Sequence, residues 1–404
     1  MSAEARPLGG RLLTPTFAAL VFVFGLAGVL ISYRLFMGVG SITALTDGYS
    51  WGIWKPINVV TFTGIGAGAY GVGLLTYVLN KGKYHPLVRP AVLVGALGYT
   101  LGGSSVMVDL GRWWNSVFLG WLPWYNLNSI LLEVAVCVIA YCGVLWVEVM
   151  PALLERWQES GGARAKAIAA RAIPILRNAL PFIIALALLL PTMHQSSLGS
   201  LYMMAPTKVH PLWFTGWMPF LFLVSCLSMG YGAVVGMDVL LGAVFRGRYR
   251  THLELLGGLG KVAAGISIFF VVWRFAMLAA EGRLGYAFGA PWIGPSGNAQ
   301  TFQIPFFWLE MALFVVSGAM YLVPAVRANR GRLFLAAFLG ILAGAAYRVN
   351  TYLTAYDPGI GWRYFPSVGE IVVTVGLASL GLAGFVLIVK KLPILALGHE
   401  GSKH

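Results

Sequence analysis

The chain has few charged residues for its length, and few cysteines. Asp, Glu, Lys and Arg make up 10% of the 404 residues, against roughly 25% in soluble domains, while 58% of residues are hydrophobic. This composition excludes a water-soluble fold. The three cysteines, Cys137, Cys142 and Cys226, all lie in apolar runs and form no CxxC pair. We therefore predict no metal site and no iron–sulfur cluster in the chain itself, so that any such cluster belongs to partner subunits.

Histidines are also few, at six. A b-type haem between membrane helices usually has two facing histidines as ligands. Only His194 lies inside an apolar run, and the other five histidines lie in loops, tails or helix ends. A methionine ligand stays open, but the histidine pattern predicts a chain without haem.

What the sequence does have is ten apolar runs of membrane-crossing length. A hydrocarbon core of roughly 30 Å takes about 20 helical residues at 1.5 Å each. We predict an all-α integral membrane protein, a single polytopic membrane domain over residues 1–404, with about ten transmembrane helices. These helices are expected at about 17–38, 56–79, 90–110, 127–149, 177–194, 213–243, 252–279, 304–325, 333–353 and 367–389.

The basic residues alternate between the two sides of this topology. Nineteen Lys and Arg residues fall on the side of both termini, six on the other side and three within helices. The positive-inside rule therefore predicts a bacterial inner membrane protein with both termini in the cytoplasm. Because these residues lie in short tracts between apolar runs, the net charge of +14 does not indicate nucleic-acid binding. The outward loops are long and aromatic, which suits either interfacial anchoring or docking of a partner protein.

Ionisable side chains within the membrane are the candidates for function. Each costs at least ~2.5 kcal/mol in hydrocarbon and needs a partner or a cavity. One set in the outer third of the membrane combines acids, arginines and a histidine, which suits a quinone head group that exchanges protons. The alternative is that these charges pair with one another to hold helices together. The set contains Asp109, Arg112, Glu133, His194, Arg274, Glu310, Arg348 and Glu370.

A second set lies toward the inner side and suggests a proton path. Glu133 and Glu148 are 15 residues apart, which is roughly 22 Å along a helix with about 60° of net rotation. Glu254 and Lys261 are seven apart and nearly eclipsed on their helix, with Asp238 expected at a comparable depth. The competing interpretation places Glu148 and Glu254 in the cytoplasmic interface.

Several segments resemble the NrfD/polysulfide reductase membrane-subunit family, on its hydrogenase-2-type branch. They span roughly residues 48–375 and read DGYSWGIWKPINV, DLGRWW, LLEVAVC, LWVEVMP, LPTMHQSSLGSL and YRVNTY. The resemblance implies two four-helix bundles plus flanking helices, and a haem-free, quinone-reactive subunit. It also implies a ferredoxin-like iron–sulfur protein docked on the periplasmic face, which in turn contacts the small and large subunits of a nickel–iron hydrogenase.

The resemblance also supports assigning roles to residues. It implies that Glu133 and Glu148 serve quinone chemistry and proton movement, and that His194, Asp109 and Arg112 line the site. We expect Glu133, His194, Asp109 and Arg112 to take part in the chemistry. The residues expected to bind menaquinone or ubiquinone are Arg274, Arg348, Asn350, Glu310 and Glu370, and those on the proton path are Glu148, Asp238, Glu254 and Lys261.

The predicted function is therefore that of a subunit of a hydrogen:quinone oxidoreductase complex, incomplete as an enzyme alone. Its nearest rival keeps the quinone site but serves a molybdenum reductase, a multihaem cytochrome module or an alternative complex III. A secondary transporter is a more distant rival, because it predicts helices broken at matching points in inverted halves. Pro174, Pro181 and Pro191 lie in or near one helix and have no such counterpart. A passive anchor would not explain charges from seven helices at one depth.

Overall fold

The computed structural model describes residues 5–396, apart from residues 50, 122 and 124. Within these residues, ten helical segments are long and apolar enough to cross a membrane, which confirms the predicted number. They are α1 (Pro15–Met37), a composite span (Trp54–Val78), α4 (His85–Asp109), α5 (Ile130–Ser160), α6 (Ala163–Ser200), α7 (Met218–Val244), α8 (Leu253–Ala280), α9 (Ile304–Leu322), α11 (Arg330–Val349) and α12 (Val368–Lys391). Short elements add α10 (Pro324–Arg327) and two strand pairs, β1 (Ala5–Arg6) with β4 (Leu395–Ala396) and β2 (Trp292–Ile293) with β3 (Ala299–Gln300).

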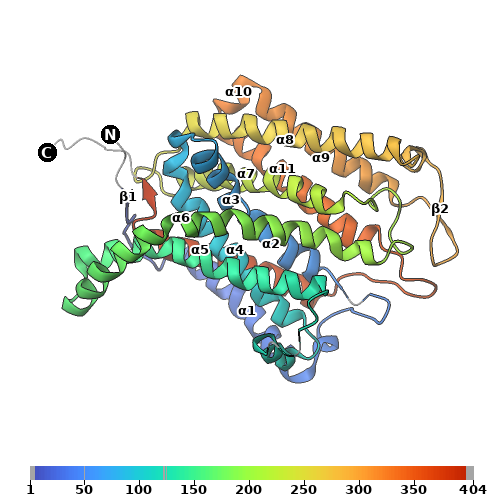
Figure 1. Cartoon of the computed structure of the whole chain (residues 1–404), viewed down its shortest axis with the longest axis horizontal. Helices are drawn as coiled ribbons and strands as arrows, with labels where there is room; N and C mark the ends of the chain where they lie inside the picture. Colours follow the sequence, from blue (N-terminus) through green and yellow to red (C-terminus); the bar gives the residue numbers. More distant parts are fainter. Residues whose placement is uncertain (1–4, 50, 122, 124, 397–404) are drawn as a thin grey trace.

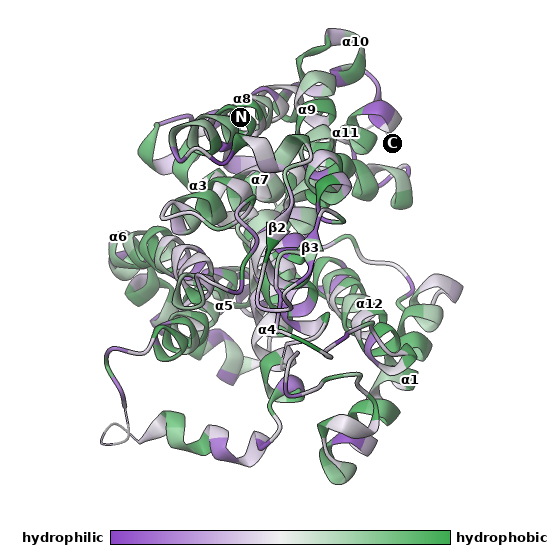
Figure 2. Cartoon of the chain, turned by 90° about the vertical axis from the view of Figure 1, so that its right-hand side faces the viewer, coloured by the Kyte–Doolittle hydropathy of each residue, from purple (hydrophilic) through white to green (hydrophobic). Residues whose placement is uncertain are grey.

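Eight of the spans form two four-helix bundles, as expected. The first bundle packs the composite span, α4, α5 and α6, and the second packs α7, α8, α9 and α11. The flanking helices α1 and α12 pack against each other and contact the first bundle at α4 and at the composite span. Figure 2 shows the helices from one end, coloured mainly as hydrophobic. The β1–β4 pair holds the two ends of the described chain together, at the left in Figure 1.

Two helices are much longer than the sequence predicts. The apolar run predicted to end at residue 149 continues as α5 to Ser160, and the one predicted to begin at residue 177 is helical from Ala163 as α6. The added turns are rich in Ala, Leu, Arg, Glu and Lys, which are good helix formers. An apolar run indicates which residues cross the hydrocarbon core, but the helix can continue beyond that core. The α5 helix ends before Gly161, and α6 begins after Gly162. The two helices project together from the bundles (Figure 1).

The composite span joins the two bundles at a glycine contact. It consists of π-helical turns at Trp54–Thr61 and Leu74–Val78 around α2 (Phe62–Gly66) and α3 (Gly68–Gly73). A Cβ atom at Gly68 would lie 2.7 Å from the Gly230 carbonyl oxygen, and one at Gly230 would lie 2.6 Å from the Gly68 nitrogen. Only glycine allows backbones to approach so closely, as is common between membrane helices.

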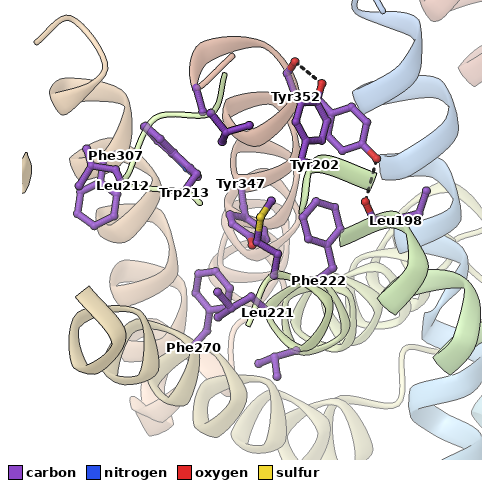
Figure 3. Packing of buried hydrophobic residues seen from close by; sticks show 14 of the residues in the cluster. Leu198, Tyr202, Leu212, Trp213, Leu221, Phe222, Phe270, Phe307, Tyr347 and Tyr352 are labelled. Carbon is purple, nitrogen blue, oxygen red and sulfur yellow. Dashed lines mark hydrogen bonds between the residues drawn. The ribbon is translucent and has the colours of Figure 1, made fainter. Parts of the chain in front are cut away.

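Aromatic side chains fill the space between α7, α8, α9 and α11. Figure 3 shows Phe222, Phe270 and Tyr347 facing one another in this cluster. At its edge the Tyr202 hydroxyl donates to the Tyr352 carbonyl oxygen at 2.8 Å, and the Tyr352 hydroxyl donates to the Leu198 carbonyl at 3.1 Å. These bonds fix the end of α6 to the end of α11, so the polar side chains on both helices have set positions.

Candidate functional site

A fully buried arginine forms the centre of the first polar cluster. Arg348 of α11 donates from Nη1 to Ser225 Oγ and from Nη2 to Gln195 Oε1, both at 3.0 Å. Gln195 Nε2 in turn lies 3.4 Å from the Tyr99 hydroxyl and 3.4 Å from His194 Nδ1. The described chain forms no salt bridge to this guanidinium, and neutral oxygen atoms solvate it. Its charge is therefore available to a ligand that gains electron density.

His194 presents one nitrogen atom without a partner. Its Nδ1 lies 3.2 Å from the Tyr99 hydroxyl, and the Tyr99 ring packs edge-on at a centroid distance of 5.3 Å. Its Nε2 is buried and has no hydrogen-bond partner in the described protein. A buried polar atom left unpaired costs free energy unless a ligand or water satisfies it. His194 thus has the surroundings expected of a ligand-binding or proton-exchanging group.

Glu133 lies at the outer edge of this cluster. It is exposed in the first turn of α5, and its Oε1 accepts a hydrogen bond from Ser197 Oγ at 2.7 Å. Ser197 is three residues after His194, so both side chains lie on the same face of α6. The cluster therefore extends from an exposed carboxylate to a buried imidazole and guanidinium. A carboxylate in a first turn also interacts favourably with the helix dipole, which is the purely structural interpretation.

A second buried cluster contains other predicted residues. Glu310 Oε2 of α9 accepts from Trp213 Nε1 and from Asn350 Nδ2, both at 2.9 Å. The Arg274 guanidinium lies 5.5 Å from the centroid of the Tyr347 ring. Glu310 Oε1, Arg274 Nε and the Tyr347 hydroxyl are all buried without a hydrogen-bond partner in the described chain. Arg274, Glu310 and Asn350 thus come together, but in the second bundle and with partners different from those of His194.

Three residues of the predicted outer set do not join either cluster. Asp109 forms an ion pair with Lys55 at 2.8 Å, and Arg112 is exposed in the loop after α4. Glu370 forms a capping box with Ser367 at the start of α12. This corrects the expectation of one convergent site, because helix ends and local ion pairs account for these charges.

The predicted inner set is also rearranged. Asp238 is buried and accepts hydrogen bonds from the Tyr249 hydroxyl and from the His252 backbone nitrogen, the latter at 3.0 Å. Asp238 therefore fastens the loop between α7 and α8, while Glu254 and Lys261 lie on the exposed surface of α8. The expected ladder from Asp238 to these two residues is not formed. They point outward because the buried face of this half of α8 is occupied by small and apolar residues, from Leu256 to Ala264.

Glu148 remains within the first bundle. Its side chain is half-buried on α5 and lies close enough to Tyr77 and Tyr141 to interact with them electrostatically. It shares the helix with Glu133, as expected from the sequence. Its part in a proton path stays a prediction.

Neutral polar residues were missed by the search for ionisable groups. Gln195 connects His194 to Arg348, Tyr99 contacts His194, and Ser197 contacts Glu133. Trp213 holds Glu310 in the second cluster. Gln195 and Ser197 stand in the segment HQSSLG, so their adjacency to a membrane histidine was the available signal.

The chain has close relatives among known proteins. The family model described as "Polysulphide reductase, NrfD" matches residues 41–353. The chain is 35% identical to a probable Ni/Fe-hydrogenase 2 b-type cytochrome subunit of Escherichia coli strain K12, covering 98% of this chain and 96% of the relative. It is 26% identical to the integral membrane subunit of a menaquinone reductase from Nitratidesulfovibrio vulgaris, with 93% and 90% covered. It is 23% identical to a selenate reductase subunit from Mesobacillus selenatarsenatis, with 94% and 93% covered.

The name of the Escherichia coli relative contradicts the prediction of a haem-free chain, because a b-type cytochrome subunit implies haem. The prediction relied on paired histidines, whereas a single histidine or a methionine also ligates haem iron. His194 and His210 are fully buried, and each has an Nε2 atom without a partner in the described chain. Both rings are tightly enclosed, with aromatic centroids at 5.3 Å from His194 and 5.0 Å from His210. Of the described residues, His194 and His210 are those that would hold a haem iron, through their unpaired Nε2 atoms.

The comparisons and the fold support the same assignment. Ten apolar spans in two bundles and a flanking pair agree with a multi-pass membrane protein, and the family match covers both bundles. The relatives are subunits of a hydrogenase, a menaquinone reductase and a selenate reductase, so a general redox role is shared among them. The chain belongs to the NrfD/polysulfide reductase family of membrane subunits of oxidoreductase complexes.

Proposed function

We propose that the chain is the quinone-reactive membrane subunit of a respiratory nickel–iron hydrogenase complex in the bacterial inner membrane. The hydrogenase would split H2 into two protons and two electrons, and a ferredoxin-like iron–sulfur subunit would deliver both electrons to the membrane. The quinone takes up these two electrons and two protons to become a quinol. Support comes from the 35% identity to the hydrogenase 2 subunit and from the menaquinone reductase relative.

The arrangement from Glu133 to His194 is the observation that carries this proposal. A quinone arrives through the lipid, so its site must open to the side of the bundle. Glu133 is exposed there, and Ser197 and His194 follow inward on one face of α6. A carboxylate and an imidazole are suitable proton carriers for the two quinone oxygens. The buried guanidinium of Arg348 would stabilise negative charge that develops on the ring during reduction.

The partner is expected at the end of the molecule opposite the chain termini. The loops at that end carry exposed aromatic and apolar side chains, among them Trp114, Trp121, Phe288, Ile293 and Phe365. Figure 1 shows these long loops on the right and below. With both termini in the cytoplasm, as the basic residues predict, this end faces the periplasm and can receive the iron–sulfur subunit. Interfacial anchoring alone remains the alternative for individual tryptophans.

The experiment is purification of the complex through a tag on this chain. We expect an iron–sulfur protein and both hydrogenase subunits to co-purify, and the complex to reduce menaquinone or ubiquinone with H2. A molybdenum enzyme in their place would favour the second candidate, a reductase subunit, to which the selenate reductase relative points. A complex that reacts with soluble dyes but with no quinone would contradict the quinone site.

A further inference from the structure

Outside the two clusters, a cleft lies at the end of the molecule where the two ends of the described chain meet. Its volume is ≈ 900 Å³. Backbone hydrogen bonds from Leu8 to Val389 at 3.0 Å and from Gly9 to Lys390 at 3.1 Å bring the N-terminal segment beside the end of α12. The last turns of α5 close the third side of the cleft, through Leu153, Arg156 and Trp157.

The lining is strongly basic. Besides Arg6, three cationic side chains, Arg156, Lys390 and Lys391, face one carboxylate, Glu159, which leaves two net positive charges among these four residues. Arg156 lies 3.7 Å from Glu159, and both side chains are largely exposed. An exposed ion pair of this length contributes little. The nearby carboxylate of Glu155 is held by Arg89 in a bidentate pair at 2.6 and 2.7 Å, outside the lining. The cleft therefore has an excess of positive charge.

The cleft also lies at the depth of lipid head groups. With 31 residues, α5 is about 46 Å long at 1.5 Å per residue, while a bilayer including its head groups is about 40–45 Å thick. The C-terminal turns of α5, which line the cleft, therefore reach the head-group layer. Trp157 is a residue type that prefers this layer, and Leu153 and Leu392 add an apolar wall. The ligand that meets both the charge and the apolar wall is a lipid.

We propose that this cleft binds the phosphate head group of an anionic phospholipid. The cations would contact the phosphate oxygens, and the acyl chains would continue along the apolar wall into the bilayer. The bound lipid would join the N-terminal segment, α5 and α12, three parts of the chain that the fold brings together at this end. Binding to the folded state alone would raise its stability by mass action. This inference does not depend on the proposed quinone function.

The test compares two double variants that lose the same charge. Arg156→Gln with Lys391→Gln removes two cations from the cleft, and Arg246→Gln with Arg332→Gln removes two exposed cations elsewhere on the same side. The intact complex is placed in phosphatidylcholine nanodiscs containing phosphatidylglycerol or cardiolipin, and bound lipid is counted by native mass spectrometry. We expect the cleft variant to retain several-fold less anionic lipid than the control. Equal retention by the two variants would overturn the proposal.

Two further measurements keep the result independent of folding and of free anions. Glu159→Gln raises the net charge of the cleft by one, so we expect it to retain more anionic lipid than the wild type, which a damaged fold would not do. Inorganic phosphate without lipid is expected to leave the unfolding temperature unchanged, whereas phosphatidylglycerol raises it. An equal rise with phosphate alone would identify a free anion as the ligand and refute the lipid assignment.

Discussion

Replacement of Glu133 by glutamine tests the proposed quinone site most directly. The change preserves the shape of the side chain and removes its charge and its proton. Ser197 Oγ, now 2.7 Å from Glu133 Oε1, can still donate to the amide oxygen. Because Glu133 is exposed, we expect the free energy of unfolding to fall by no more than about 1 kcal/mol, the cost of the weaker hydrogen bond. A loss of turnover would then reflect the chemistry of the site.

The size of the loss in quinone-linked turnover distinguishes two possible roles of Glu133, which are positioning the site and carrying protons. A hydrogen bond to a charged group contributes about 1.5–3 kcal/mol, against about 0.5–1.5 kcal/mol for a neutral one. Weakening the bond from Ser197 thus costs about 1 kcal/mol, or roughly fivefold in rate. A carboxyl group that transfers a proton in the reaction contributes about 10²–10⁴-fold. We therefore expect quinone-linked turnover to fall at least about 100-fold if Glu133 is a proton carrier.

The assay uses the purified complex with H2, and compares reduction of a quinone with reduction of a soluble dye by the partner subunits alone. Dye reduction should remain at the wild-type rate. Ser197→Ala removes the hydrogen bond and keeps the carboxylate, which is exposed and can bond to water instead, so it should lose about 1.5 kcal/mol, or roughly tenfold in rate. Glu254→Gln, an exposed glutamate on α8, is the control and should retain full quinone turnover. If Glu133→Gln loses no more than Ser197→Ala, Glu133 positions the site and does not carry protons.

Three other outcomes follow from the geometry. Gly230→Ala should lower the unfolding temperature by an amount that corresponds to about 1–3 kcal/mol or more, because its Cβ would lie 2.6 Å from the Gly68 nitrogen. The control is Gly28→Ala, whose Cβ would have nothing within 4 Å. Equal unfolding temperatures of the two variants would refute the close contact. Arg348→Lys should lose the simultaneous hydrogen bonds to Ser225 of α7 and Gln195 of α6, because a lysine lacks the forked guanidinium. One of the two acceptors is then unpaired at a cost of about 1–3 kcal/mol, and quinone turnover should slow. A variant as stable as the wild type would contradict this. Burial of His210 lowers its pKa to about 4, so between about pH 6.5 and pH 4 the imidazole takes up a proton in the unfolded state only. The free energy of unfolding should therefore decrease as the pH is lowered through this range, by up to about 3 kcal/mol. Calorimetry should find this pH dependence reduced in His210→Asn.

The transmembrane spans could be predicted because the hydrocarbon core allows the backbone very few conformations. Backbone groups in hydrocarbon must be paired within the segment, so an apolar run of sufficient length is a helix. The same reasoning says nothing about helices beyond the hydrocarbon core, which is why the extension of α5 to Ser160 was missed. The π-helical turns of the composite span were also missed; the turn at Trp54–Thr61 packs against α4 and α11, and the hydropathy of the local sequence does not indicate these contacts.

The site was only partly predictable because the depth of a charged residue in the membrane does not identify the residues that it contacts. His194, Arg348 and Glu310 were found as charges in the membrane, and all three are buried among polar groups. Glu370 was found in the same way, yet it caps α12. Its capping box with Ser367, three residues earlier, is a pattern that the sequence itself displays. Comparing each buried charge with capping patterns first would have removed this residue from the quinone set.

The two buried clusters are connected through α11 and the π-helical turn, Asn350–Thr354, that continues it. Arg348 and Asn350 are two residues apart, so on a helix their side chains point in nearly opposite directions, about 200° apart. Arg348 contacts Gln195 of the first bundle, whereas Asn350 contacts Glu310 of the second. A shift of α11 that tightens one contact must therefore move the other. The π-helical turn after α11 is also bonded to α6, through the Tyr352 hydroxyl and the Leu198 carbonyl oxygen. Events at His194 can therefore reach Glu310 through Gln195, the Arg348 side chain and the backbone between Arg348 and Asn350.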